Sequence, residues 1–218
     1  MSSEVDLVIF DNDGVLVDSE LLANHVLADL LTELGVPTTV EQSVARYLGG
    51  TVARVRTVVR DERGVELPAE FDDTYHRRLF AAFEASLTPV PGVEAALDAL
   101  AAVPLATCVA SSGTHERIAL AHRITGLARR FEGRVFSAED VAHGKPSPDL
   151  FLHAAERCDV DPAACVVVED SPLGVAAARA AGMRVLGFAA VTPASRLADA
   201  DEVFTSMAAL PGLVASLG

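Results

Sequence analysis

The chain has 218 residues, half of them hydrophobic, which suits one sizeable α/β domain or one domain that carries a smaller insert. Its 31 acidic residues outnumber its 17 basic residues, and the resulting net charge of −14 argues against nucleic acid and anionic membrane as partners. The same charge would repel an anionic substrate, so a phosphate site needs local positive charge from a metal or from placed Lys and Arg residues.

The first apolar run, Val5–Phe10, reads as a buried strand, and it stops abruptly at Asp11 and Asp13. Residues 20–86 then contain no convincing strand. Leucines at 27, 30, 31 and 34 have the spacing of an amphipathic helix with Ser19 as its expected N-cap. Thr39 and Gln42 form an expected capping box for a second helix, and an apolar stripe from Phe71 to Phe83 predicts a last one.

After residue 87, short apolar runs alternate with helical patterns. The expected strands are Leu105–Ala110, Val166–Val168, Arg184–Phe188 and Glu202–Phe204, and the expected helices are Val93–Ala102, Thr114–Ile124, Pro148–Arg157 and Pro172–Ala181. Ser147 is the expected N-cap of the third of these helices. The alternation predicts an α/β fold, a doubly wound, Rossmann-like parallel sheet core with an inserted helical segment.

Polar residues follow the expected strands at the edge where open α/β sheets bind ligands. The set comprises Asp11, Asp13, Ser111, Ser112, Glu169 and Asp170, with Lys145 just before a helix. Clustered carboxylates repel one another, and Mg²⁺ is the hard cation that such oxygen ligands suit. A carboxylate can then attack phosphorus, a second can transfer the proton, and Ser and Lys can hold the phosphoryl oxygens. Each signal is weak alone, since Asp, Ser and Thr after a strand also cap helices.

The four segments together resemble the haloacid dehalogenase superfamily. FDNDGVLVDS resembles its first motif, DxDGxxxDS, and VASSG, HGKPSPD and VVVEDS resemble the second, third and fourth. The resemblance covers essentially the whole chain, and the helical insert is similar to the α-helical cap of the β-phosphoglucomutase-like and sugar-phosphatase branch. It implies a core domain of residues 1–16 plus 87–218 and a cap domain of residues 17–86.

The resemblance also implies a role for each motif residue. Asp11 would be the nucleophile and a metal ligand, and Asp13 the general acid/base with its backbone carbonyl on the metal. Ser111 would bind the phosphoryl group, Lys145 would pair with that group and Asp11, and Glu169 and Asp170 would complete the Mg²⁺ site. Ser112, Glu20, Gly49, Gly50 and Thr51 are the candidate substrate-binding residues. Gly49–Thr51 has an equally strong interpretation as a turn between two helices. His25 is as well explained as a surface histidine, and Asn24 is a further candidate hydroxyl ligand.

The branch decides between hydrolysis and transfer. The dehalogenases lack the second Asp of the first motif, so Asp13 argues for phosphoryl chemistry. Leu48 and Val52 stand where the similar mutases carry cations for a second phosphate, and Ala23 replaces a mutase histidine. We therefore expect a Mg²⁺-dependent phosphatase for a small sugar, sugar-acid or polyol monophosphate, acting through an aspartyl-phosphate. A phosphosugar mutase is the alternative, because Arg46 or Arg54 could reach the site after a small change of register.

A non-catalytic receiver-like phosphoacceptor is a third hypothesis, and the motif order and the insert argue against it. The expected partner is a small phosphorylated metabolite. The sequence predicts no oligomeric state, and a monomer is compatible with it.

Cysteines and apolar runs bear on localisation. Cys108, Cys158 and Cys165 are odd in number, lack CxxC spacing and lie in apolar stretches, which favours buried free thiols in a reducing cytosol. No signal-peptide pattern is present, and no apolar run reaches the roughly 18–20 residues of a membrane span. We expect a cytoplasmic protein.

Overall fold

A parallel β-sheet organises the structure, a computed structural model that describes residues 5–48 and 50–217. Its strand order is β3-β2-β1-β4-β5-β6, and every neighbouring pair is parallel. The strands are β1 (Leu7–Phe10), β2 (Ala106–Ser111), β3 (Val135–Ser137), β4 (Cys165–Glu169), β5 (Arg184–Phe188) and β6 (Glu202–Phe204). The central β1 is completely buried because strands flank it and helices cover both of its faces. The expected doubly wound α/β fold is confirmed.

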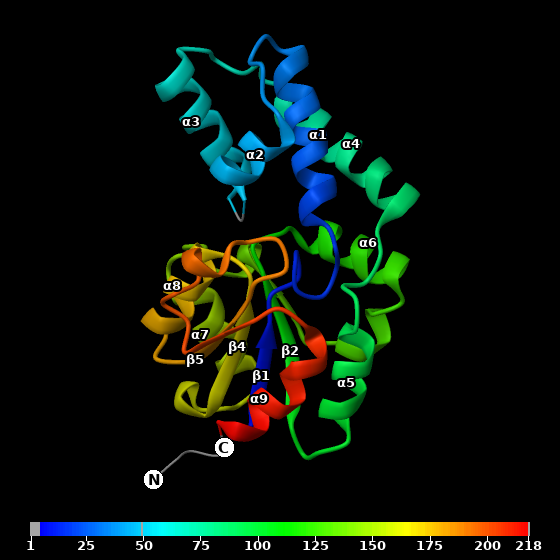
Figure 1. Cartoon of the computed structure of the whole chain (residues 1–218), viewed down its shortest axis with the longest axis vertical. Coiled ribbons are helices and arrows are strands. Elements are labelled where there is room, and N and C mark those ends of the chain that lie inside the picture. Colours follow the sequence, from blue (N-terminus) through cyan, green and yellow to red (C-terminus); the bar gives the residue numbers. More distant parts are fainter. Residues whose placement is uncertain (1–4, 49, 218) are drawn as a thin grey trace.

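Helices cover both faces of the sheet (Figure 1). Each face buries alternate residues of the same strands. Leu7 and Ile9 pack with α7 (Asp149–Arg157) and α8 (Pro172–Ala180). Val8 and Phe10 belong to the opposite cluster, which includes α5 (Val93–Ala101), α6 (His115–Thr125) and α9 (Leu210–Ser216). This double coverage fixes the register of the sheet, and therefore which side chains reach its carboxyl edge.

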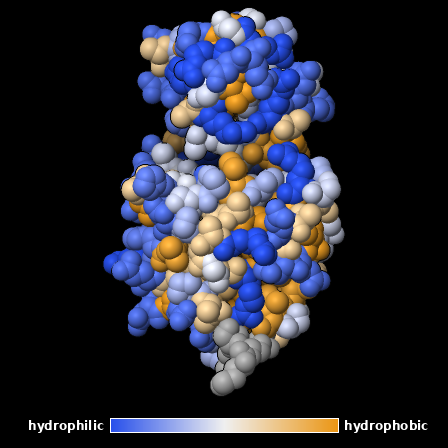
Figure 2. Space-filling model, turned by 90° about the vertical axis from the view of Figure 1, so that its left-hand side faces the viewer, coloured by the Kyte–Doolittle hydropathy of each residue, from blue (hydrophilic) through white to orange (hydrophobic). Residues whose placement is uncertain are grey.

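Four helices of residues 20–86 lie beyond that edge, and we call them the helical insert (Figure 1). They are α1 (Glu20–Glu33), α2 (Val40–Tyr47), α3 (Val52–Arg63) and α4 (Phe71–Ser86). The predicted Thr39–Gln42 capping box opens α2, and the stripe from Phe71 to Phe83 is buried along α4. In Figure 2 the insert forms the upper, mostly hydrophilic part of the molecule.

Some local predictions need correction. Ser147 does not cap α7, because its hydroxyl donates to Asp149 Oδ1 at 2.5 Å and the helix begins only at Asp149. Ser19 precedes α1 as expected, but its side chain makes no cap hydrogen bond and donates to Asp13. The sequence analysis did not predict β3 or α9, and it gave no bounds for α3, the helix that follows the expected turn at residues 49–51. Within the part of the chain described, no helix is both long and apolar enough to cross a bilayer.

Candidate active site

The turn after β1 presents Asp11 at the carboxyl edge of the sheet. The Asp11 amide donates to the Val168 carbonyl at 2.9 Å, so the β1–β4 pairing continues one residue past β1. Gly14 has a φ of +78°, a left-handed conformation that favours glycine. A Cβ at this position would lie 2.1 Å from Asp170 Oδ2. The glycine therefore lets the turn close and lets the Asp170 carboxylate approach.

Lys145 lies at the carboxyl edge of the sheet, which we call the floor of the site, and it forms ion pairs with two of the acids found there. Its Nζ donates to Asp11 Oδ1 at 2.6 Å, to Glu169 Oε1 at 2.5 Å and to the Ala110 carbonyl at 3.0 Å, so each ammonium proton has an acceptor. The side chain is only 4% exposed. Burial alone would lower the pKa of Lys145, but the Asp11 and Glu169 carboxylates outweigh it and raise that pKa. Lys145 is therefore a permanent local positive charge.

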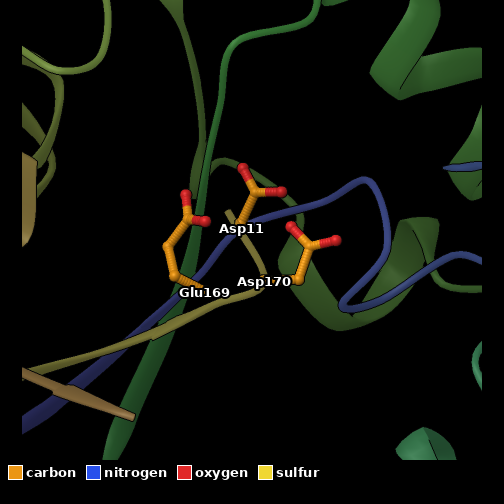
Figure 3. Close-up of side chains that lie close together, drawn as sticks. All are labelled: Asp11, Glu169 and Asp170. Carbon is orange, nitrogen blue, oxygen red and sulfur yellow. The ribbon is translucent and has the colours of Figure 1, made fainter. Parts of the chain in front are cut away.

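Three buried carboxylates, those of Asp11, Glu169 and Asp170, gather around one point (Figure 3). One oxygen from each lies within 4.8 Å of the others. Burial raises the pKa of Asp11 to about 7; Glu169 and Asp13 add to the rise and Lys145 opposes it. Burial, with the charges of Glu20 and Glu169, also raises the pKa of Asp170 well above its usual value. Lys145 alone does not neutralise this group.

The donor set fits a hard divalent cation such as Mg²⁺, because it offers only oxygen atoms and carries excess negative charge. Glu169 is held in place from β4 and α8. Ser171 donates to Glu169 Oε2 from its backbone amide and from its hydroxyl, both at 3.0 Å. A Cβ at Gly174 would lie 1.8 Å from Glu169 Oε1, so only glycine leaves room for this carboxylate. The Asp13 side chain lies outside the three-carboxylate group, and a contribution from its backbone carbonyl stays a prediction.

The turn after β2 supplies hydroxyl groups on the opposite side of Asp11. Ser111 is buried and its Oγ accepts a hydrogen bond from the Gly113 amide at 3.0 Å. Ser112 is half-buried and lines the same cavity. Thr114, rather than Ser112, is the N-cap of α6, because its side chain accepts a hydrogen bond from the Arg117 amide. Ser111 and Ser112 are therefore not used for helix capping.

Arg117 is a residue of this site that the sequence analysis missed. Its Nη2 donates to Asp13 Oδ1 at 2.8 Å, and its side chain is 19% exposed. Burial alone would lower the pKa of Arg117. Asp13 and the neighbouring Tyr75 and Glu20 outweigh burial, so the pKa is raised above its usual value. A cation in the first turn of a helix opposes the helix dipole. That mismatch is the signal from which a nearby acid could have been suspected.

The helical insert closes the other side of a cavity of about 260 Å³. Glu20 and Asn24 reach it from α1, and Tyr75 and His76 reach it from α4. Burial raises the pKa of Glu20 to about 8, with the Asp13 charge adding to the rise and Arg117 opposing it. The Asn24 amide group donates to the Glu20 carbonyl at 2.8 Å, and its Oδ1 accepts a bond from Ser43 at 2.7 Å. The insert therefore faces the strand ends with polar groups, among which the Glu20 carboxyl has a raised pKa.

The cavity brings together nearly all the site residues expected from the sequence. Those that line it are Asp11, Asp13, Glu20, Gly50, Thr51, Ser111, Ser112, Lys145, Glu169 and Asp170. Gly49 lies outside the described residues. His25 is exposed and does not line this cavity. Thr51 also caps α3 by accepting a hydrogen bond from the Arg54 amide, so the turn interpretation of residues 49–51 holds beside the cavity-lining one.

Comparison with known proteins places this geometry in a family. The haloacid dehalogenase-like hydrolase family profile matches residues 5–182. The chain belongs to this family. It is 31% identical to 6-phosphogluconate phosphatase of Escherichia coli over 86% of this chain and 84% of that protein, and 30% identical to hexitol phosphatase A of the same organism over 91% and 90%. A crystal structure of a conserved haloacid dehalogenase-like protein from Agrobacterium tumefaciens superposes with a TM-score of 0.86 at 38% identity, covering 98% of this chain and 99% of that one.

Family membership and the phosphatase relatives confirm the expected enzyme class, a phosphoric monoester hydrolase. Arg46 and Arg54 were the reason to keep a phosphosugar mutase as an alternative function. Arg46 pairs with Glu62 at 2.6 Å on the surface, and the Arg54 side chain lies beside Gly50. Neither arginine is among the described residues that line the cavity of this hydrolase.

Proposed function

We propose that this hydrolase is a Mg²⁺-dependent phosphatase that acts on a small sugar, sugar-acid or polyol monophosphate through an aspartyl-phosphate at Asp11. The observation that carries the proposal is the buried Asp11–Lys145–Glu169 network beside Asp170, in one cavity between the sheet and the helical insert. It combines a fixed nucleophile, a fixed cation and a carboxylate set suited to Mg²⁺.

In the first step, a carboxylate oxygen of Asp11 forms a bond to phosphorus as the bond between phosphorus and the ester oxygen breaks. Asp13 donates a proton to the departing oxygen, which leaves as an alcohol. In the second step, Asp13 takes a proton from water, the water oxygen bonds to phosphorus, and the Asp11 carboxylate is released with inorganic phosphate. Two easier displacements replace one difficult one.

The remaining groups hold and neutralise the phosphoryl oxygens. Lys145 supplies a positive charge that does not titrate near pH 7, and the Ser111 hydroxyl and nearby amides supply donors. Asp11, Glu169 and Asp170, with the Asp13 carbonyl, would hold Mg²⁺. When bound, Mg²⁺ supplies further neutralisation of the phosphoryl and carboxylate charge.

The helical insert selects the alcohol part of the substrate in this proposal, acting as a cap domain of residues 17–86 on a core of residues 1–16 and 87–218. Glu20, Gly50 and Thr51 face the cavity beside Ser112. A cavity of about 260 Å³ suits a small metabolite. The names of two relatives, a phosphatase for a sugar-acid phosphate and one for hexitols, support the same substrate range. We also propose a cytoplasmic location, in keeping with the free thiols of Cys108, Cys158 and Cys165.

The test is phosphate release from a panel of sugar, sugar-acid and polyol phosphates, with Mg²⁺ and with EDTA. We expect release from a group of related esters, dependent on Mg²⁺ and abolished by Asp11→Asn. Asp6→Asn, on an exposed residue before β1, is the matched control and should be fully active. Turnover that persists in Asp11→Asn would refute the mechanism, and isomerisation of a hexose phosphate without phosphate release would replace the phosphatase by a mutase.

A further inference from the structure

Arg117 is a half-buried cation in the cavity to which the proposed mechanism gives no role. It comes from the first turn of α6, and its Nη2 donates to Asp13 Oδ1 at 2.8 Å. The Phe83 ring of α4 packs on its other side, with the ring centroid 5.5 Å from Cζ. Arg117 therefore touches both the acid of the first motif and the helical insert.

The two carboxylate oxygens of Asp13 have different surroundings. Oδ1 accepts two hydrogen bonds, one from Ser19 Oγ at 2.5 Å and one from Arg117 at 2.8 Å. Oδ2 accepts none from any residue that the structure describes. It lies 3.7 Å from the point where a Cβ on Gly113 would stand, so it faces the turn that follows Ser111 at the end of β2. One oxygen is thus anchored and the other is presented to the cavity.

We propose that Arg117 is a positioning residue for proton transfer, which anchors Asp13 through Oδ1 so that Oδ2 points at the ester oxygen of the substrate. This inference rests on the proposed function. In the first step the O–H bond at Asp13 Oδ2 breaks, the bond between phosphorus and the ester oxygen breaks, and the proton ends on the departing alcohol. The anchor leaves the carboxylate few rotamers, and general acid catalysis depends on this geometry.

A general preference for ion pairs does not explain the arrangement. A cation near a helix N-terminus is unfavourable, and burying a guanidinium costs solvation that a surface pair would not lose. Ser19, which would ordinarily cap α1, also gives its hydroxyl to the same Asp13 oxygen and makes no cap bond. An unfavourable position for a cation and the loss of a helix cap therefore both accompany the anchoring of Asp13 Oδ1.

Leaving-group dependence separates this role from a structural one. A para-nitrophenolate leaves readily without a proton, whereas a sugar or polyol alkoxide needs one. The experiment compares kcat/KM for para-nitrophenyl phosphate with kcat/KM for the alkyl phosphate that the wild-type enzyme hydrolyses fastest. Each kcat/KM value reports only the steps up to the first phosphoryl transfer. The attack of water in the second step therefore does not affect the comparison.

The variants are Arg117→Gln and Arg117→Lys, with Arg123→Gln as the matched control. Arg123 lies on the same helix, is 69% exposed and is 3.9 Å from Glu84 of α4. We expect Arg117→Gln to lower kcat/KM about 10²-fold on the alkyl ester and less than about tenfold on the aryl ester, the size of a misdirected general acid. Arg117→Lys should lie between Arg117→Gln and wild type, and Arg123→Gln should match wild type on both esters.

Equal losses on the two esters, or no loss on the alkyl ester, would overturn the inference while leaving the phosphatase intact. A wild-type enzyme inactive on every ester would instead refute the proposed function, and the inference with it. If Arg117→Gln does not fold, Arg117→Lys decides the matter alone, since it keeps the charge and most of the aliphatic stem.

Discussion

The floor of the cavity, formed by the strand ends, and its roof, formed by the helical insert, differ in the charge of the groups that they present. On the floor, the strand ends bring charged groups into contact, and Lys145 is bonded to Asp11 and Glu169 at 2.6 and 2.5 Å. On the roof, the insert offers Asn24, Tyr75 and a Glu20 carboxyl whose pKa is raised to about 8. Two of the three floor carboxylates, Asp11 and Glu169, are paired with Lys145 and held in place, whereas the roof offers an amide, a phenol and a carboxyl group with a raised pKa.

The difference teaches where reaction and selectivity reside. Paired charges held in place by hydrogen bonds are preorganised, so they stabilise developing charge without rearrangement. Neutral hydrogen-bonding groups at the roof can distinguish alcohols without opposing an anionic phosphate. Changes on the floor should therefore abolish turnover or unfold the protein, and changes on the roof should alter substrate preference or local helix stability.

Lys145→Met should have the largest effect, because it leaves the buried carboxylates of Asp11 and Glu169 without their cation. We expect kcat to fall at least about 10²-fold through lost charge stabilisation, and the free energy of unfolding in EDTA to fall by about 3 kcal/mol. Urea unfolding and phosphate release measure the two effects. Removal of the exposed Arg60 guanidinium by Arg60→Gln is the control; a fully stable Lys145→Met protein would contradict the idea of a tightly coupled floor.

His122 contacts Asn12, which lies between Asp11 and Asp13, and the pH dependence of the free energy of unfolding tests this contact. Its Nε2 lies 2.9 Å from Asn12 Oδ1, and burial lowers its pKa to about 4. Between pH 6.5 and 4 the unfolded chain therefore binds the proton and the folded one does not, so this contribution to stability is full above pH 6.5 and is lost as pH falls. We expect a loss of about 2–3 kcal/mol over that interval.

The measurement is urea unfolding of wild type and His122→Gln at several pH values, because other groups titrate in the same range. The difference in slope isolates His122. An exposed histidine of the insert, His25, provides the control variant His25→Gln. Identical pH profiles for wild type and His122→Gln would show that His122 is not held neutral in the fold.

Mg²⁺ should stabilise the folded protein by binding at the floor, and Asp170→Asn should remove that response. At ten times its dissociation constant, Mg²⁺ raises the free energy of unfolding by about 1.4 kcal/mol. Asp170 carries a raised pKa without metal, so its amide replacement should change stability in EDTA very little. Thermal unfolding with and without Mg²⁺ measures both. A full Mg²⁺ response in Asp170→Asn would place the cation elsewhere.

Thr51→Ala should have the smallest effect, and it falls on the roof. Thr51 accepts a hydrogen bond from the Arg54 amide as the N-cap of α3, and loss of a cap costs about 1 kcal/mol. Thr51→Ser keeps the cap and is the matched variant. If Thr51→Ala instead changes KM for one substrate of the panel selectively while stability is retained, the hydroxyl serves substrate and not the helix.

The floor could be predicted from the sequence because sheet topology brings strand ends to one edge whatever the details. Asp11, Ser111 and Glu169 each follow an apolar run that forms a strand, so the fold alone brings them together. Arg117 escaped prediction because it lies on a helix, where its direction depends on the rotation of α6 against the insert. The edge strand β3 escaped because three residues carry too little periodicity.

Other errors came from competition for the same hydroxyl groups. Ser19 and Ser147 both stand where a helix cap is expected, yet each donates to a carboxylate, Asp13 in one case and Asp149 in the other. A sequence pattern records that a hydroxyl is available near a helix start. It does not record that a nearby carboxylate binds the hydroxyl more strongly than a backbone amide does.

Trapping of the covalent intermediate tests the central claim most directly. Borohydride reduces an acyl phosphate to an alcohol, so an aspartyl-phosphate quenched during turnover becomes homoserine, which peptide mass spectrometry locates. We predict homoserine at position 11, only with Mg²⁺ and substrate present, and none in the Asp11→Asn variant. Steady phosphate release with no reduced residue at position 11, or with the modification at another acid, would contradict the account.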